Sequence, residues 1–411
     1  MNRLAALFAI GTVFYSFAQT KAEPMGLTSV ADGKVRQLEA PPEGGAARAI
    51  IVDDLPLAHT TQVFPVDAQG KLVGGKEFQP QAEQVFKNLG AALATVGASA
   101  ERIVKLNLYI AADELAAPTQ AFINQRLRGP IRPAVSLVVT RLPEDGALIA
   151  ADAVALADAA RSSRRNSGNE SAAPSGDFVQ AAVLPAGERI YISGQAEPGD
   201  LKTATRKTLE SLRATLKFLG RTDRDVVELK AFVTPMSSSE TVKQELQAFF
   251  GDLPVPPYSL VEWESTLPIE IELVAAGGKP AAAAEASSRI EYLTPPGMTA
   301  SPVFSRLARV APGPLIYVSG LYGGSKASGA SQVQAIFQEL TEALELTGSD
   351  LRHLAKATYY VTNDDASNAL GKLRPDYYDP QRPPAASKAM VRGVGQTGKT
   401  ITLDMIAVPV K

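Results

Sequence analysis

Cysteine is absent from this chain of 411 residues, and histidine occurs only twice. Without cysteine the chain can form no disulfide, offers no thiolate to a metal, and lacks the residue that lipoproteins use for lipid attachment. The two histidines, His59 and His353, belong to no HxxxH or HExxH pattern, so the sequence predicts no metal site. Its glycine-lysine fragments lack a P-loop framework, and we expect no cofactor.

An excess of charge of one sign is also lacking. The 41 lysines and arginines nearly balance the 43 aspartates and glutamates, which leaves a net charge of −2 and a pI of about 5.9. A surface that binds nucleic acid needs a basic stripe, so we expect no nucleic-acid partner. With 45% hydrophobic and 20% charged residues, the composition is that of an ordinary soluble globular protein.

The apolar run at the N-terminus is short and has the pattern of an export signal. Arg3 precedes the largely apolar residues 4–18, and small residues at 16–18 or 20–22 offer a cleavage site. A membrane span requires about 20 apolar residues, more than this run provides. We therefore predict a signal peptide over 1–22, secretion to a bacterial periplasm, and no membrane contact after cleavage. A retained anchor is the alternative.

One sequence block occurs three times, at residues 88–110, 211–233 and 339–361. In each copy leucines lie eight and four residues before a shared glycine, and apolar residues follow it at +6, +9, +11 and +13. The shared glycines, aligned without a gap, are Gly97, Gly220 and Gly348. They recur about every 125 residues, which is the size of a domain rather than of a solenoid repeat.

Two segments have the composition of linkers and divide the chain into three domains. Residues 158–176 are small, polar and charged, and residues 277–289 are rich in glycine, alanine and serine. We predict the domains at 25–157, 177–276 and 290–411.

The order of elements can be predicted within each repeat. An amphipathic pattern predicts a helix that ends at the shared glycine, and period-2 alternation predicts the strand that follows. In the second repeat we expect strands at 189–194, 226–233, 258–263 and 269–275, and helices at 203–219 and 240–250. The third repeat follows the same order, and the first opens with a strand around 62–66. Each repeat is thus expected to be an α+β domain with two helices on one face of a sheet.

Four segments carry a resemblance to a known family. They are IYISGQ (190–195), LPIEIELVAA (267–276), IYVSGL (316–321) and RPAVSLVVTRLP (132–143). Together with the leucine-rich helix that ends in glycine, they resemble the RidA/YjgF family of reactive intermediate/imine deaminases, once labelled L-PSP endoribonucleases. The resemblance extends over nearly all of residues 50–411, linkers excepted.

The resemblance implies chorismate-mutase-like α+β units. Family members form homotrimers whose sheets close into a central barrel, with ligand clefts between neighbouring subunits. Three such units in one chain imply a monomeric pseudo-trimer that closes one barrel by itself, and linkage would raise the effective concentration of the units. Three separate units, each trimerising with other chains, are the alternative.

The resemblance also implies a chemistry, the hydrolysis of 2-imino or enamine acids. In the family an arginine holds the substrate carboxylate, a glutamate directs the attacking water, and a tyrosine lines the cleft. The arginine positions are occupied here by Val135, Tyr258 and Ala386, and the serines that follow are Ser136, Ser259 and Ser387. The glutamate positions hold Ala150, Glu270 and Thr402, and the tyrosine positions hold His59, Phe178 and Phe304.

The usual arginine is therefore expected to be missing from all three repeats. Glu270 is our candidate catalytic residue, and Arg382 and Lys388 are candidates for a replacement anion site. The predicted ligand contacts are Tyr258, Ser259, Phe178, His59, Ser136, Phe304, Ser387 and Arg382.

Three functions remain open at this point. The first is an exported triple-repeat protein that binds a small molecule at inter-repeat clefts, with the family's reaction lost or altered. The second is a divergent deaminase or other hydrolase centred on Glu270. The third is a scaffold or interaction protein. Because the repeats differ, at most one or two clefts should function. A polar cleft at Glu270 with a cation reaching into it would favour catalysis, and clefts filled by apolar side chains would favour the scaffold.

Overall fold

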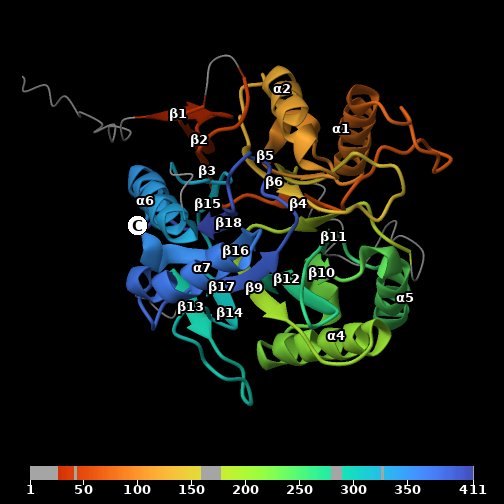
Figure 1. The fold of residues 1–411 in the computed structure, drawn as a ribbon. Helices are drawn as coiled ribbons and strands as arrows, with labels where there is room; N and C mark the ends of the chain where they lie inside the picture. The colour runs from red at the N-terminus through yellow and green to blue at the C-terminus, as the bar shows by residue number, and fades with distance from the viewer. Residues whose placement is uncertain (1–25, 41–43, 159–176, 279–288, 325–327, 411) are drawn as a thin grey trace, which may run out of the picture.

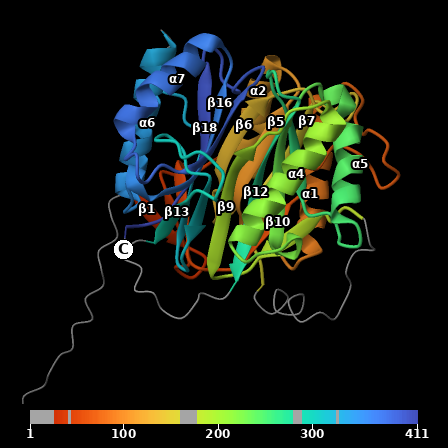
Figure 2. The same cartoon turned by 90° about the horizontal axis from the view of Figure 1, so that it is seen from below.

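The computed structural model describes residues 26–40, 44–158, 177–278, 289–324 and 328–410. The predicted signal peptide and nearly all of both predicted linkers lie outside these ranges. The described chain forms an α+β structure with three sheets and six α-helices. Figures 1 and 2 show the sheets gathered inside and the helices outside, in three pairs. No described helix is long and apolar enough to cross a membrane.

The second repeat has the predicted elements. Its strands and helices are β9 (Glu188–Gln195), α4 (Leu201–Phe218), β10 (Val226–Val233), α5 (Ser239–Phe250), β11 (Tyr258–Glu262) and β12 (Ile269–Gly278). Helix α4 begins where Asp200 accepts a hydrogen bond from the Thr203 amide, and its leucines pack on the sheet. Gly220 follows its end with φ +67°, a left-handed conformation that glycine adopts without strain.

The other repeats contain the same series. The first has β4 (Leu57–Thr60), α1 (Phe78–Ala94), β5 (Ile103–Ile110), α2 (Ala116–Arg126), β6 (Ala134–Val139) and β7 (Ile149–Leu156). The third has β15 (Leu315–Val318), α6 (Gly329–Leu346), β16 (Leu354–Val361), α7 (Asp364–Tyr377), β17 (Ala385–Met390) and β18 (Ile401–Ala407). In the second repeat, β10 pairs antiparallel with β12 and parallel with β11. The first repeat has the same pairing between β5, β7 and β6, and the third has it between β16, β18 and β17.

The opening strand of the first repeat lies earlier than predicted. It was expected around 62–66, but β4 spans Leu57–Thr60 and pairs His59 with Val154 of β7. The pair formed by His59 and Val154 corresponds to the pair formed by Tyr191 and Val274 in the second repeat. Thr61 and Gln62 of the first repeat therefore correspond to Ser193 and Gly194 of the second. In the second repeat this strand ends at a Ser-Gly pair, and the first repeat has no such pair to mark where the strand ends.

The first strands of each repeat extend the sheet of another repeat. Strands β1 (Leu27–Val30), β2 (Val35–Leu38) and β3 (Ala49–Val52) of the first repeat join the third repeat's sheet through β15. Strand β8 (Ala181–Leu184) of the second repeat joins β4 of the first. Strands β13 (Ile290–Leu293) and β14 (Leu307–Val310) of the third repeat join β9 of the second. The described strands form three separate sheets, and no closed barrel is found among them.

Two apolar clusters are shared by all three repeats. One contains Val154, Tyr191 and Tyr317, and the other contains Tyr109, Phe232 and Tyr360. The Phe232 ring lies 6.3 Å from that of Tyr360 and 6.1 Å from that of Trp263, so this tryptophan belongs to the core. Burial of these large side chains ties the repeats together.

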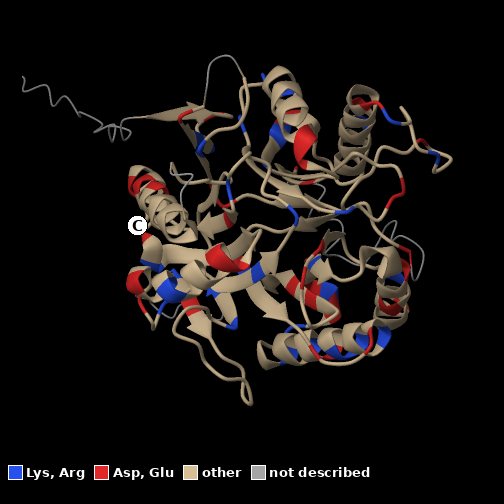
Figure 3. Ribbon diagram, viewed as in Figure 1, with Lys and Arg blue, Asp and Glu red and all other residues tan. Residues whose placement is uncertain are grey.

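A second kind of contact between repeats is ionic. The inward faces of the strands carry buried lysines and carboxylates, visible as coloured segments near the centre of Figure 3. Three ion pairs there link different repeats: Lys105 to Asp404 at 3.0 Å, Lys356 to Glu272 at 2.7 Å, and Lys230 to Asp404 at 3.7 Å. We call this group the ionic layer. Its pairs hold charges that would be costly to bury alone.

Candidate functional site

The junction between the second and third repeats contains a cavity of about 600 Å³. The second repeat contributes Gly194 of β9 and Glu270 of β12, and the third repeat contributes cationic, polar and aromatic side chains from three segments. These are Phe304, Arg306, Arg374, Ser387 and Lys388. The structure thus brings together four of the predicted site residues, which are Glu270, Phe304, Ser387 and Lys388. We call this cavity the Glu270 cleft.

Glu270 lies against the bend of the chain at Gly194. A Cβ atom at position 194 would collide with the Glu270 carboxyl group, so glycine is required for the carboxylate to lie there. Among the described residues, Oε1 of Glu270 is buried without a hydrogen-bond partner. Burial raises the pKa of Glu270 to about 7, although a hydrogen bond with Ser387 acts in the opposite direction. Both protonation states are therefore populated near neutral pH.

Two hydrogen bonds join the repeats at the floor of the cleft. The Gly194 amide donates to Ser387 Oγ at 3.0 Å, and the Ala386 amide donates to Ser193 Oγ at 2.9 Å. Ser387 is therefore a structural contact between the repeats as well as a lining residue. The side chains on either side of it, Ala386 and Lys388, line the cleft.

Cations reach the cleft from the third repeat. Lys388 Nζ donates to Ser367 Oγ of α7 at 2.8 Å. Partial burial and the charge of Arg374 lower the pKa of Lys388, and Glu270 opposes this effect. The Arg374 guanidinium lies 5.3 Å from the centre of the Tyr359 ring. Arginine over an aromatic face is stabilised by cation–π attraction, which fixes its position.

The equivalent position between the first and second repeats is filled. Gln62 replaces Gly194, and its amide both donates to the Leu260 carbonyl and accepts from the Leu260 amide, each at 3.2 Å. The rings of Tyr258 and Phe178 pack together with their centres 5.2 Å apart and their planes tilted by 47°. Ala150, in the position of Glu270, is fully buried. The predicted contacts Tyr258, Ser259 and Phe178 therefore meet at a junction without a carboxylate.

The equivalent position between the third and first repeats also lacks the glutamate. Thr402 replaces Glu270 and donates to the Leu321 carbonyl at 3.0 Å. Val135 and Leu137 are buried. Ser136 accepts a hydrogen bond from Lys105 Nζ at 2.7 Å, so it belongs to the ionic layer.

Two predicted residues lie elsewhere. His59 does not occupy the cleft position of Phe304, because the shifted β4 places it level with Tyr191, where its Nδ1 lies 2.5 Å from a Glu228 carboxylate oxygen. Arg382 does not line the Glu270 cleft; its guanidinium lies over Tyr292 at 5.4 Å.

Arg374 and Arg306 were missed by the sequence analysis. Arg374 is one of several charged residues of α7, and only the packing of this helix over β17 selects it. Nothing in the sequence distinguishes it from its neighbours. No group of three or more potential metal ligands is found in the described part of the chain.

Comparison with known proteins gives consistent matches. The family model described as "Endoribonuclease L-PSP" matches residues 45–157 and 169–277. The RutC family protein PH0854 of Pyrococcus horikoshii is 30% identical over 115 residues, which are 25% of this chain and 88% of that protein.

Solved structures resemble single repeats. The Rid-family protein YyfB of Yersinia pestis is 25% identical, with 32% of this chain and 99% of that chain covered and a TM-score of 0.27. NMB1025 of Neisseria meningitidis, a YjgF-family member, is 20% identical, with coverages of 30% and 96% and a TM-score of 0.23. At such scores the structural likeness adds nothing to the sequence match.

Proposed function

This chain belongs to the endoribonuclease L-PSP (RidA/YjgF) family and contains its unit in tandem, and from that premise we propose that it binds a small organic acid in the Glu270 cleft. One observation carries the proposal. Glu270, whose carboxylate has one buried oxygen without a hydrogen-bond partner among the described residues, lines a cavity of about 600 Å³ together with three cationic side chains, Arg306, Arg374 and Lys388. An unsatisfied buried polar atom is costly to maintain, and a ligand that donates a hydrogen bond to it would remove that cost.

The proposal includes a replacement for the family's arginine. That position is Ala386, so Lys388 on the same strand and Arg374 on α7 would hold the carboxylate of the ligand. Charge-assisted hydrogen bonds contribute about 1.5–3 kcal/mol each. The other junctions support one site per chain, because Ala150 and Thr402 stand at the position of Glu270 and neither supplies a carboxylate.

A specific observation favours imine hydrolysis as a second candidate. The pKa of Glu270 is about 7, close to the value that suits a general base at neutral pH. Glu270 would take a proton from a water molecule that attacks the C=N carbon, and would return a proton to the departing ammonia. The products would be ammonia and a 2-oxo acid. A scaffold role is supported less well, since the Glu270 cleft is polar rather than filled.

The proposal also covers the assembly of the three repeats and the location of the protein. The cyclic exchange of first strands between repeats supports a monomeric pseudo-trimer. Export to a periplasm would place the site away from the cytoplasmic enzymes that generate most imino acids, which favours a changed ligand or reaction.

Titration calorimetry with 2-oxobutyrate tests the binding proposal. We expect one site per chain, and a loss of at least tenfold in affinity in the double variant Lys388→Ala/Arg374→Ala. Glu210→Gln, which changes an exposed glutamate of α4, is the control and should bind as the parent does. Absence of saturable binding, or unchanged affinity in the double variant, would refute the proposal.

A coupled assay tests the second candidate. 2-Iminopropionate is generated in situ, and the release of ammonia is followed with and without the protein. Acceleration that is lost in Glu270→Gln but kept in Glu210→Gln would support hydrolysis. Equal rates with and without the folded protein would leave binding as the function.

A further inference from the structure

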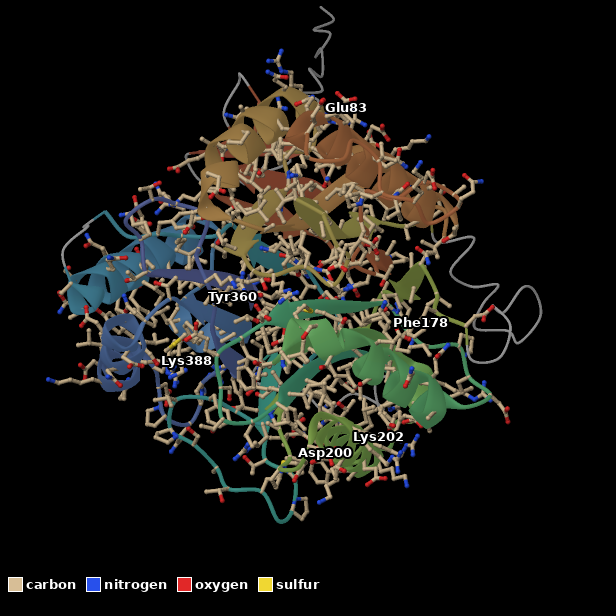
Figure 4. All side chains as sticks on the ribbon, turned by 45° about the vertical axis from the view of Figure 1, so that its right-hand side comes forward. Glu83, Phe178, Asp200, Lys202, Tyr360 and Lys388 are labelled. Carbon is tan, nitrogen blue, oxygen red and sulfur yellow. The ribbon has the colours of Figure 1, made fainter. Side chains whose placement is uncertain are left out.

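Lys388 is the feature of the Glu270 cleft that has no counterpart in the other repeats. It follows Ala386 by two residues on β17, so both side chains project from the same face of the strand. The equivalent residues are Leu137 and Leu260, and both are buried in their repeats. A primary amine therefore lines the one junction where the glutamate position is still a glutamate. Figure 4 shows Lys388 on the third repeat, well apart from Phe178.

We propose that Lys388 forms a reversible Schiff base with the carbonyl group of a 2-oxo acid or aldehyde bound in the Glu270 cleft. This inference rests on the proposed function, because the cleft must first admit such a ligand. It adds a covalent step that ligand binding alone does not require.

The surroundings of Lys388 suit a nucleophilic amine. A lysine becomes nucleophilic at neutral pH when it is partly desolvated and lies near another cation. Both conditions are met, because partial burial and Arg374 lower the pKa of Lys388. The hydrogen bond from Nζ to Ser367 of α7 holds the amine between β17 and this helix.

Glu270 supplies the acid and base that the step requires. The lone pair of Nζ attacks the carbonyl carbon, and a proton moves from nitrogen to oxygen to give a carbinolamine. Protonated Glu270 then gives a proton to the hydroxyl group, which leaves as water while the C=N bond forms. The resulting iminium loses its proton to the Glu270 carboxylate. Amine and carbonyl are thereby converted to imine and water with no oxidant or reductant, and hydrolysis reverses the sequence.

The buried lysines are unsuited to this role. Lys105, Lys230 and Lys356 are each at most 8% exposed and take part in ion pairs of the ionic layer. A carbonyl ligand cannot reach them in the folded protein. Lys202 of α4, which is exposed, lies 3.9 Å from Glu245 and does not line the Glu270 cleft. Selective reaction at one lysine is therefore the signature of the proposed site.

The test is reductive trapping. The protein is incubated with pyruvate and sodium cyanoborohydride, which reduces an imine to a stable secondary amine, and the products are measured by intact mass and peptide mapping. We expect one adduct per chain on the peptide that contains Lys388, saturating with pyruvate. Lys388→Arg should lower labelling at least tenfold, and Lys202→Arg should leave it unchanged. Glu270→Gln should slow labelling at least tenfold.

The outcomes separate the two proposals. Labelling spread over exposed lysines and unaffected by Lys388→Arg overturns the Schiff base. If calorimetry still shows 2-oxobutyrate binding to the parent and to Lys388→Arg, which keeps the positive charge, the binding proposal survives without it. Absence of both adduct and binding removes both proposals. Butyrate, which has the carboxylate but no carbonyl, should compete with labelling and give no adduct itself.

Discussion

Removing one partner of a buried ion pair should destabilise the protein strongly. Lys356 Nζ lies 2.7 Å from Glu272 Oε1, and the two residues are 8% and 3% exposed. In Lys356→Met the volume is nearly conserved, but among the described residues the Glu272 carboxylate keeps only the Thr358 hydroxyl as a hydrogen-bond donor. An uncompensated buried charge of this kind costs about 3–5 kcal/mol. That cost lowers the ratio of folded to unfolded protein by a factor of about 10² to 10⁴.

Urea unfolding measures this loss. The single tryptophan is Trp263, which lies in a core cluster shared by the three repeats, so its fluorescence reports on the packing of the repeats. The double variant Lys356→Met/Glu272→Met should recover most of the lost stability, because two apolar residues replace the pair. The exposed pair of Lys243 and Glu240, 3.6 Å apart, is the control. Lys243→Met should cost less than about 1 kcal/mol.

Two results would refute this reasoning. One is a Lys356→Met variant within about 1 kcal/mol of the parent, which would mean that water or a shift of the carboxylate compensates for the lost amine. The other is a double variant as unstable as the single one, which would mean that the loss reflects packing rather than charge.

Two further predictions concern the Glu270 cleft. Gly194→Ala places a methyl group against the Glu270 carboxyl group and should abolish measurable 2-oxobutyrate binding by calorimetry while circular dichroism shows the fold retained; unchanged affinity would contradict the geometry. Because the folded-state pKa of Glu270 is raised from 4.5 to about 7, the folded protein binds this proton more tightly than the unfolded chain does. The parent should therefore lose stability relative to Glu270→Gln as pH rises from about 4 to about 7, with no further change above about pH 8. Urea midpoints of the parent and of Glu270→Gln at pH 5, 6, 7 and 8 would test this. A difference between the two proteins that stays constant with pH would show that burial does not raise the pKa of Glu270.

The repeats and their elements could be predicted from the sequence because local patterns encode them. The spacing of leucines before Gly220 and the alternation after it depend on helix and strand periodicity alone. Glu270 was likewise identified by its position in a strand motif. The exchange of first strands between repeats has no local signal, since β8 and β14 match any sheet edge of suitable hydrophobicity.

The cleft was predicted only in part for a related reason. Glu270, Phe304 and Ser387 stand at positions that the repeat alignment defines. Arg374 enters the cleft from a helix whose rotation over β17 depends on tertiary packing. His59 was misplaced because the first repeat has Thr61 and Gln62 where the alignment relied on serine and glycine.

The asymmetry of the ionic layer has a consequence for how such a chain can evolve. Lys105, Glu228 and Lys356 occupy the same position of their respective repeats, so the second repeat has a carboxylate where its neighbours have a lysine. Three copies of the second repeat would enclose Glu228 and Glu272 three times each against Lys230 three times, an excess of buried negative charge that folding cannot offset. The second repeat therefore depends on neighbours that carry lysine at this position, and it could not form a homotrimer with the same stability. The three repeats are then inherited together as one chain, and a binding site can be gained or lost at one junction without a change at the others.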